Sequence, residues 1–305
     1  IAMLRELMGR IRKLPEVKTV GGLAGLNIIS FSNKTNVGTM FVLLKPWDER
    51  TGDEHTSQAV AAKISKAVAD VREARVLAIL PPAIPGLGAT SGFTFELQQT
   101  TANGGIKEFE GVSQKFLAAV NQRPEIAMAY TFFNTRTPSY KVDVDREKAK
   151  QLNVNVANVY TTLSTLLGST YVNDINLYGR NFRVMAQAHS LYRSSLDQLN
   201  RYYMKNNAGG MVPISSLVTT TLIESPAVIS HYNVYRSIEI NGSAKPGFSS
   251  GQAIEALKEV ADQSLPAGYS YEFSGMSREE IKAGSSSVYI FMLSLVFVFL
   301  FLAAL

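Results

Sequence analysis

Hydrophobic residues recur along the chain with helical spacing in some segments and with alternating spacing in others. The first helix carries its apolar positions on one face and ends at Pro15. Strands are predicted at 17–31, 39–44 and 75–80, and a second helix at 55–71. An amphipathic first helix needs a sheet to cover, so we expect a strand before residue 1. That strand would complete the β-α-β-β-α-β order of split βαβ folds.

The same arrangement begins again near residue 93. A strand is predicted at 93–98 and is followed by a helix that contains Phe116. The exit Arg123-Pro124-Glu125-Ile126 resembles Leu14-Pro15-Glu16-Val17 in the first unit, which indicates an internal duplication. A strand at 237–240, a helix around Leu257 and a strand at 269–273 complete this second unit.

Residues 137–227 interrupt the second unit and read as an insertion. Asp145 is a candidate N-cap between a strand at 140–144 and two helices that extend to residue 167. Further strands are predicted at 169–172, 183–188 and 211–214, separated by turns rich in Asn and Gly. The whole pattern predicts an α+β protein with two split βαβ units and an inserted α+β unit.

The chain ends in an unbroken apolar run, 288–305. The run carries no charge and follows the charged stretch 278–282. A buried core helix would show one polar face, and this run shows none. At roughly 18 residues it reaches the length that enters a bilayer core of about 30 Å, so we interpret it as the start of a transmembrane helix.

Composition and candidate chemistry exclude several classes of protein. Hydrophobic residues make up 46% of the chain and charged residues 18%, which is typical of an ordered protein. The net charge of +5 comes from basic residues scattered among acids, so no nucleic-acid surface is predicted. His55, His189 and His231 lack metal-ligand spacing, cysteine is absent, and no nucleophile motif occurs. We therefore expect no metal site, no cofactor and no enzyme activity.

Several motifs resemble those of the resistance-nodulation-division transporters of the hydrophobe/amphiphile efflux type. They occur in the same order along essentially all of the chain. The motifs are Leu43-Leu44-Lys45-Pro46-Trp47-Asp48-Glu49-Arg50, Pro82-Ala83-Ile84, Ser91-Gly92-Phe93-Thr94-Phe95-Glu96-Leu97, Val142-Asp143-Val144-Asp145-Arg146-Glu147-Lys148-Ala149, Tyr171-Val172-Asn173-Asp174, Met211-Val212-Pro213 and Ser274-Gly275-Met276-Ser277.

The resemblance implies that the chain is the second large periplasmic loop of a drug pump in the inner membrane of a Gram-negative bacterium. Residues 1–92 would form the first C-terminal porter subdomain, and residues 93–136 with 228–275 the second. Both would be ferredoxin-like. Residues 137–227 would form the docking subdomain, and residues 276–305 a linker and a truncated transmembrane helix.

The resemblance also implies binding residues for drugs. Those of the deep pocket would be Leu23, Gly25, Ile28, Ser30, Phe31 and Phe41. Those of the entrance pocket would be Leu77, Ile79, Pro81, Tyr130 and Phe132. Residues 27–36 would form the switch loop between the pockets, including Asn27, Ser32, Asn33, Lys34, Thr35 and Asn36. Family members often carry Phe at 23, 28, 77 and 79 and a basic residue at 130, so their substrate preferences are not transferred.

The implied partners are amphiphilic or hydrophobic drugs, a periplasmic adaptor protein, an outer-membrane channel, the membrane and two further copies in a homotrimer. Proton movement would occur through membrane helices outside this segment. Two alternatives remain open. One is a membrane-tethered periplasmic ligand-binding or sensory domain, and the other is a related pump for metal ions, which the scattered methionines disfavour.

Overall fold

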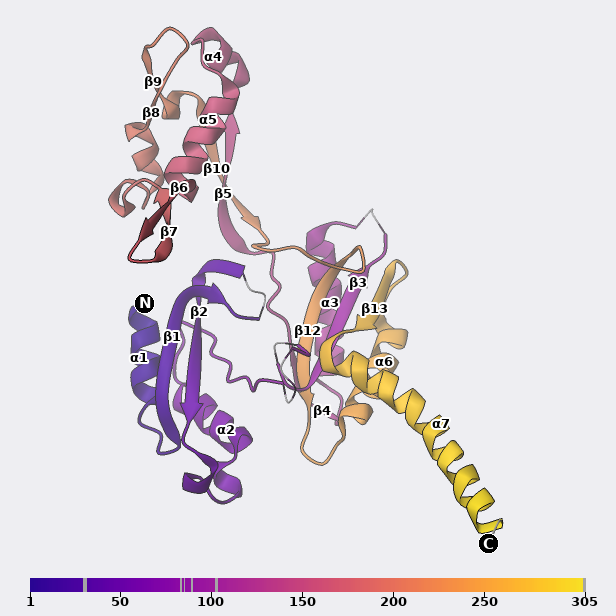
Figure 1. Cartoon of the computed structure of the whole chain (residues 1–305). Helices are drawn as coiled ribbons and strands as arrows, with labels where there is room; N and C mark the ends of the chain where they lie inside the picture. The colour runs from indigo at the N-terminus through magenta and orange to yellow at the C-terminus, as the bar shows by residue number, and fades with distance from the viewer. Residues whose placement is uncertain (30–31, 83, 85, 89, 102–103, 304–305) are drawn as a thin grey trace. The chain divides into compact units, whose positions relative to one another are not determined.

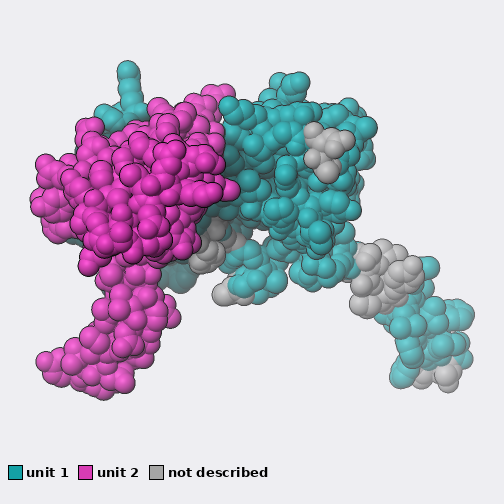
Figure 2. Space-filling view, turned by 90° about the horizontal axis from the view of Figure 1, so that it is seen from above, with its two compact units in different colours: residues 1–135, 226–305 teal, residues 136–225 magenta. Residues whose placement is uncertain are grey.

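A computed structural model describes the chain except residues 30–31, 83, 85, 89, 102–103 and 304–305, and except the side chains of 35 and 285–290. Helices and small antiparallel sheets are mixed along the chain, which confirms the predicted α+β class (Figure 1). The chain divides into two compact units, coloured separately in Figure 2. Unit 1 contains residues 1–135 and 226–305, and unit 2 contains residues 136–225.

The first part of unit 1 is a hairpin with one face covered by helices. Its elements are α1 (Ala2–Ile11), β1 (Val17–Asn27), β2 (Ser32–Leu44), the short helices Trp47–Glu49 and Asp53–His55, and α2 (Ser57–Ala67). β1 and β2 pair antiparallel. Leu7 and Ile11 of α1 and Val60 and Ile64 of α2 form a core with Val20 of β1. The Thr56 hydroxyl accepts a hydrogen bond from Ala59 N and caps α2.

Two predictions for this part are wrong in detail. β2 begins at Ser32 rather than at residue 39, so much of the predicted loop 27–36 belongs to the hairpin. Residues 75–80 are not a strand, because none of the described strands forms a ladder with them. Val76 and Ala78 nevertheless pack against the core. Side-chain packing, and not strand pairing, therefore positions this segment.

The second part of unit 1 is built around an antiparallel sheet. Its strands are β3 (Phe93–Gln99), β4 (Ile126–Tyr130), β11 (Ser230–Tyr232), β12 (Tyr235–Ala244) and β13 (Tyr269–Phe273). Four of them follow the order β13-β3-β12-β4, and β11 pairs with the start of β12. Helices α3 (Ile106–Val120) and α6 (Ser250–Ser264) bury their apolar faces against one side of this sheet.

The two parts repeat a local backbone arrangement, which supports the predicted duplication. Glu16 follows α1 and its carbonyl oxygen accepts a hydrogen bond from Lys45 N at 2.9 Å. Glu125 follows α3 and its carbonyl oxygen accepts one from Lys245 N at 2.8 Å. In both parts the strand after the glutamate starts opposite the residue before the lysine, with Val17 opposite Leu44 and Ile126 opposite Ala244.

Unit 2 has its own hydrophobic core. Its elements are β5 (Thr137–Val144), α4 (Arg146–Gln151), α5 (Val156–Leu163) with a π-helical turn Ser164–Gly168, β6 (Thr170–Leu177), β7 (Arg180–Ala186), short helices Ser190–Tyr192, Leu196–Arg201 and Ile214–Ser216, β8 (Tyr203–Lys205), β9 (Met211–Pro213) and β10 (Val218–Ser225). Asp145 caps α4 as predicted, because its carboxylate accepts a hydrogen bond from Lys148 N. Fully buried Val159, Ile214 and Leu217 lie in the core.

β6 and β7 form a hairpin that stands out from this core. Most residues of the two strands are exposed, and we call this hairpin the arm of unit 2. Ile175 lies opposite Phe182 in the ladder, and each side chain is nearly half exposed. The arm therefore contributes little to the stability of unit 2 on its own.

α7 (Gly275–Ala303) follows β13 directly and includes most of the predicted apolar run. The run also includes residues 304–305 and the side chains of 288–290, which lie outside what is described. Over the part of the chain that the structure describes, no helix has both the length and the apolar character needed to cross a membrane.

Candidate functional site

The β1–β2 hairpin exposes an apolar stripe on the face that α1 and α2 do not cover. Val20 and Val42 lie opposite each other and face the core. Side chains alternate along a strand, so Leu23 and Phe41 lie on the other face. Leu23 is 47% exposed and Phe41 is 51% exposed. Two of the predicted deep-pocket residues therefore share one accessible surface.

Gly25 and Ile28, also predicted for the deep pocket, lie near the end of the hairpin. Gly25 has φ of +88°, a conformation that favours glycine, and lies where the register between the strands is irregular. Ile28 is half-buried, and its backbone N donates to the Thr39 hydroxyl at 3.4 Å. Ser30 and Phe31 lie outside the described residues.

The predicted switch-loop residues belong largely to the strands of the hairpin. Asn27 is buried at the end of β1, and its side-chain oxygen accepts a hydrogen bond from Ile29 N at 3.0 Å. Ser32, Asn33, Lys34, Thr35 and Asn36 form the start of β2, and the side chain of Thr35 is not described. Burial lowers the pKa of the Lys34 ammonium group.

Leu77 and Ile79 lie in the irregular segment before the prolines. They are half-buried and alternate with Val76 and Ala78, which pack against the core. Pro81 is exposed, and Ser91 N donates a hydrogen bond to Leu80 O at 2.8 Å.

Tyr130 and Phe132 lie at the end of β4, and their ring centroids are 5.4 Å apart in an edge-to-face arrangement. Tyr130 is only 6% exposed, whereas Phe132 is half-buried. Burial raises the pKa of the Tyr130 hydroxyl to about 12, a hydrogen bond with Thr90 acts in the opposite direction, and the charge of Glu239 raises the pKa further. This pair is thus polar at one end and aromatic over most of its surface.

The sequence interpretation missed a polar cluster on the side of the β3–β12–β13 sheet that faces away from α3 and α6. Thr94 and Glu96 alternate with Phe93, Phe95 and Leu97 along β3, and both polar side chains are buried. The Thr90 and Thr94 hydroxyls bond the Asn241 amide oxygen at 3.0 and 3.3 Å. The alternation in Phe93-Thr94-Phe95-Glu96-Leu97 is the signal that could have predicted this polar face.

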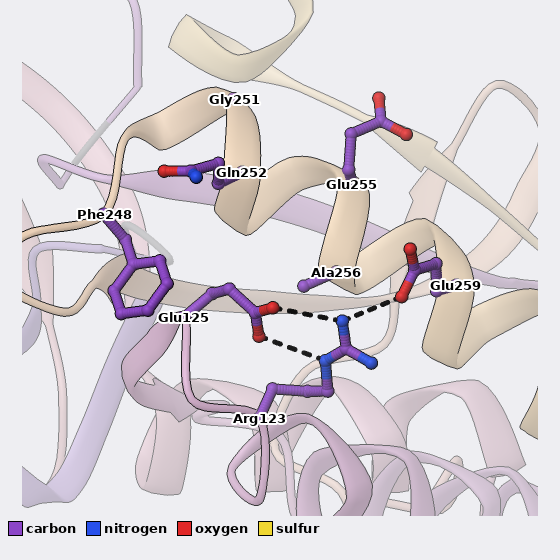
Figure 3. Close-up of a pocket in the computed structure, with 8 residues that line it drawn as sticks. All are labelled: Arg123, Glu125, Phe248, Gly251, Gln252, Glu255, Ala256 and Glu259. Carbon is purple, nitrogen blue, oxygen red and sulfur yellow. Dashed lines mark hydrogen bonds and ion pairs between the residues drawn. The ribbon is translucent and has the colours of Figure 1, made fainter.

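A shallow hollow of about 350 Å³ lies between α6 and the turn before β4. Figure 3 shows the side chains that line it. Its lining includes none of the residues predicted to bind drugs. Arg123 pairs with Glu125 through Nε at 3.1 Å and with Glu259 through Nη2 at 2.8 Å. The guanidinium group at this hollow is already paired with carboxylates, so we assign the hollow no ligand.

Metal binding was not predicted. Among the described residues, His, Asp and Glu side chains form no group of three or more that could hold a metal ion. His55 instead lies beside buried Glu16, with Nδ1 and Oε1 2.9 Å apart.

Comparisons with known proteins give a match over the whole chain. The AcrB/AcrD/AcrF family matches residues 1–305. The toluene efflux pump membrane transporter TtgB of Pseudomonas putida is 36% identical over 291 residues, which is 95% of this chain and 27% of TtgB. The multidrug export protein AcrF of Escherichia coli (strain K12) is 34% identical over 95% of this chain and 28% of AcrF. The multidrug resistance protein MdtF of the same Escherichia coli strain is 33% identical over 95% of this chain and 27% of MdtF.

Proposed function

Because the chain belongs to the AcrB/AcrD/AcrF family of resistance-nodulation-division efflux transporters, we propose that it is the C-terminal periplasmic part of a proton-driven multidrug pump. The observation that carries this proposal is the match over residues 1–305, together with relatives whose names describe efflux transporters. The chain spans 27% of the length of TtgB and 28% of AcrF, so the activity belongs to the whole pump and not to this segment alone.

We assign the two parts of unit 1 to two ferredoxin-like porter subdomains, 1–92 and 93–136 with 228–275. The strand order β13-β3-β12-β4 supports the second assignment. Numbered along the subdomain, this order is 4-1-3-2, with two helices on one face, as the split βαβ arrangement requires. The repeated bonds of Glu16 and Glu125 to the two lysine amides support the first assignment by analogy.

Residues 137–227 are assigned to docking against an outer-membrane channel, within a homotrimer that also binds a periplasmic adaptor. Unit 2, residues 136–225, has a separate core and an arm on which apolar side chains such as Ile175 and Phe182 are exposed among polar ones. A separate core lets one subdomain make contacts without unfolding its neighbours, and exposed apolar side chains are typical of surfaces that other chains cover. This segment would lie mainly in the periplasm, next to the inner membrane.

Drug binding is assigned to the apolar stripe of the β1–β2 hairpin and to the segments around Ile79 and Tyr130. Leu23 and Phe41 offer accessible apolar surface for hydrophobic or amphiphilic compounds. Ile28 and Phe31 would extend the deep pocket, and residues 27–36 would gate it as the switch segment. Leu77, Pro81 and Phe132 would line the entrance pocket. Movement of the porter subdomains would open and close these surfaces in turn.

The test is accumulation of a panel of fluorescent drugs in cells that carry the full-length pump. We expect Phe41→Ala and Tyr130→Ala to raise accumulation several-fold at normal expression, because each removes aromatic contact surface. Leu43→Ala is the matched control for Phe41, since Leu43 is 57% exposed on the same face but is not assigned to the pocket. Tyr130→Phe keeps the ring and separates loss of the ring from loss of the hydroxyl. Unchanged efflux across the panel in both alanine variants would disprove the pocket assignment.

The named relatives are efflux transporters, which favours this proposal over a membrane-tethered sensory domain. The absence of a metal-binding cluster from the described residues gives no support to a pump for metal ions.

A further inference from the structure

Three glutamates form a row across the polar face of the β3–β12–β13 sheet. Glu239 of β12 and Glu272 of β13 both lie directly opposite Glu96 of β3. Neighbouring residues of each strand face the apolar core, so all three carboxyl groups project from the other face. Directly opposed side chains of antiparallel strands are about 5 Å apart at Cβ, and like charges at such positions repel.

Glu96, at the centre of the row, is buried and joins three elements. It is 7% exposed. The Ser237 hydroxyl of β12 donates to Glu96 Oε2 at 2.6 Å, and the Ser274 hydroxyl donates to Oε1 at 3.0 Å. Ser274 lies between the end of β13 and the start of α7. One carboxyl group thus connects the middle strand, its neighbour and the residue that leads into α7.

The start of α7 is attached to β3 at a second point. Ser274 N donates to Thr94 O at 3.1 Å, and Thr94 N donates to the Ser277 hydroxyl at 3.1 Å. Ser277 is 2% exposed. Thr94 and Glu96 are successive positions on the polar face of β3, so this face holds the entry into the helix through hydrogen bonds.

The surroundings of Glu96 favour its neutral form. Burial raises the pKa of the Glu96 carboxyl, and the charges of Glu239 and Glu272 raise it further, whereas the hydrogen bonds from Ser237 and Ser274 act in the opposite direction. Among the described residues, no Lys, Arg or His lies within ion-pair distance of these three glutamates.

Charged groups on the neighbouring elements are directed elsewhere. On α7, Arg278 and Glu279 are exposed, and Glu280 accepts a hydrogen bond from Ser250 of α6 at 2.5 Å. The β11–β12 turn contributes Asn233, whose amide donates to Glu272 at 2.6 Å. Asn241 of β12 donates to Glu239 at 2.5 Å. Amide donors therefore support the two outer carboxylates, and among the described residues no cation offsets a charge on the central one.

We propose that Glu96 is a proton-sensitive switch whose neutral carboxyl group holds the start of α7 against β3 and β12, and whose ionisation weakens that attachment. In the ionised state three adjacent carboxylates repel one another across both flanking strands. The serine hydroxyls bind the ionised carboxyl group more strongly, so they oppose release, whereas burial and the two adjacent carboxylates favour exposure of the ionised Glu96 to water. We place this opening at the Ser274 contact, because Ser274 lies outside the β13 ladder. The relevance of the switch to transport rests on the proposed function. The protonation of Glu96 does not depend on the proposed function.

The proposal predicts the direction of the pH dependence. When folding raises the pKa of a carboxyl group, the protonated group contributes to the stability of the folded state. This contribution is fully present below the pKa of the group in the unfolded chain, and it is lost as the pH rises through the pKa in the folded state. The attachment of α7 should therefore weaken from acidic to neutral pH. Glu96→Gln keeps a neutral polar side chain of the same length, so it should remove this dependence.

Hydrogen exchange of the purified full-length transporter, read by mass spectrometry from about pH 5 to about pH 8, tests the switch. After correction for the intrinsic exchange rate, we expect protection of residues 274–278 to fall several-fold as the pH rises in the unaltered protein. The same peptides of Glu96→Gln should stay protected throughout. Glu255→Gln, an exposed substitution on α6, is the control and should behave as the unaltered protein does.

A second variant keeps the test independent of how well Glu96→Gln folds. Glu239→Gln removes one neighbouring negative charge, which lowers the pKa of Glu96 and reduces the repulsion that follows its ionisation. The loss of protection should therefore move to lower pH and become smaller. A pH dependence that is unchanged in both Glu96→Gln and Glu239→Gln would overturn the proposal. Failure of the Phe41 and Tyr130 efflux test would overturn the pocket assignment and leave this result intact.

Discussion

Single residues of this chain acquire their roles from neighbours that are distant in the sequence. Glu16 follows Pro15 and belongs to a short repeated motif, yet it is 2% exposed in the structure. Its carboxylate accepts a hydrogen bond from Lys63 of α2 and lies 2.9 Å from Nδ1 of His55. Glu125, at the repeated position, pairs with nearby Arg123 and is more exposed. The two glutamates look alike in the sequence, but of the two only Glu16 is a buried ion-pair residue.

Acid should weaken the contribution of Glu16. The bond to Lys63 lowers the pKa of Glu16 to about 2, burial opposes this change, and His55 assists it. The stabilisation is fully present above the unfolded pKa of about 4.5 and is lost as the pH falls through about 2. Glu16→Gln should lower the free energy of unfolding at neutral pH by about 3 kcal/mol, measured by urea denaturation, and by progressively less in acid. Glu125→Gln is the control, and an equal loss in both variants would contradict the assignment.

At the scale of elements, the sheet of β3 and β12 depends on a close approach of two backbones. Gly92 precedes β3 and has φ of +96°. A Cβ atom at this position would lie 2.1 Å from the carbonyl oxygen of Gly242 in β12. A backbone atom cannot move aside as the end of a flexible side chain can, so glycine is required at residue 92.

Gly92→Ala should therefore cost more than conformational strain alone. We expect the free energy of unfolding to fall by more than about 3 kcal/mol, measured by urea denaturation. Gly86→Ala is the matched control, because Gly86 has φ of +94° and nothing within 4 Å of the added Cβ. That control should lose only about 1 kcal/mol. Similar losses in the two variants would show that the contact with Gly242 does not limit the residue at position 92.

At the scale of the whole molecule, two separate hydrophobic cores each stabilise their own part of the chain. Leu217 lies in the core of unit 2 and Leu257 in the core of the β3–β12–β13 sheet, and both are fully buried. The chain enters unit 2 at β5 and leaves it at β10, where Thr137 and Ser225 lie opposite each other. Such an insertion can lose its packing while the surrounding unit keeps its own.

Leu217→Ala and Leu257→Ala should each cost about 2 to 5 kcal/mol in the core that contains the residue. Hydrogen exchange of the whole chain should show lost protection within 136–225 for Leu217→Ala. The loss should fall within 93–135 and 226–275 for Leu257→Ala. Each variant serves as the control for the other, and loss of protection that spreads equally over both units would contradict independent cores.

The sequence by itself determined the α+β class, the interrupted second unit, the helices with clear periodicity and the resemblance to efflux transporters. These follow from local spacing and from motif order, which do not depend on how distant segments meet. The start of β2 and the segment 75–80 were predicted wrongly, because a strand exists only where a partner strand completes its hydrogen bonds.

Only the tertiary structure decided which predicted residues are accessible and which polar groups are buried. Leu23 and Phe41 face away from the core, whereas Tyr130 is nearly covered, although all three belong to apolar or aromatic segments. Strand register places Glu96, Glu239 and Glu272 side by side. Glu96 and Glu272 are 176 positions apart in the sequence (272 − 96 = 176). Strand register sets which side chains are buried and which charges lie close together. The pattern of residues in one sequence does not specify this register.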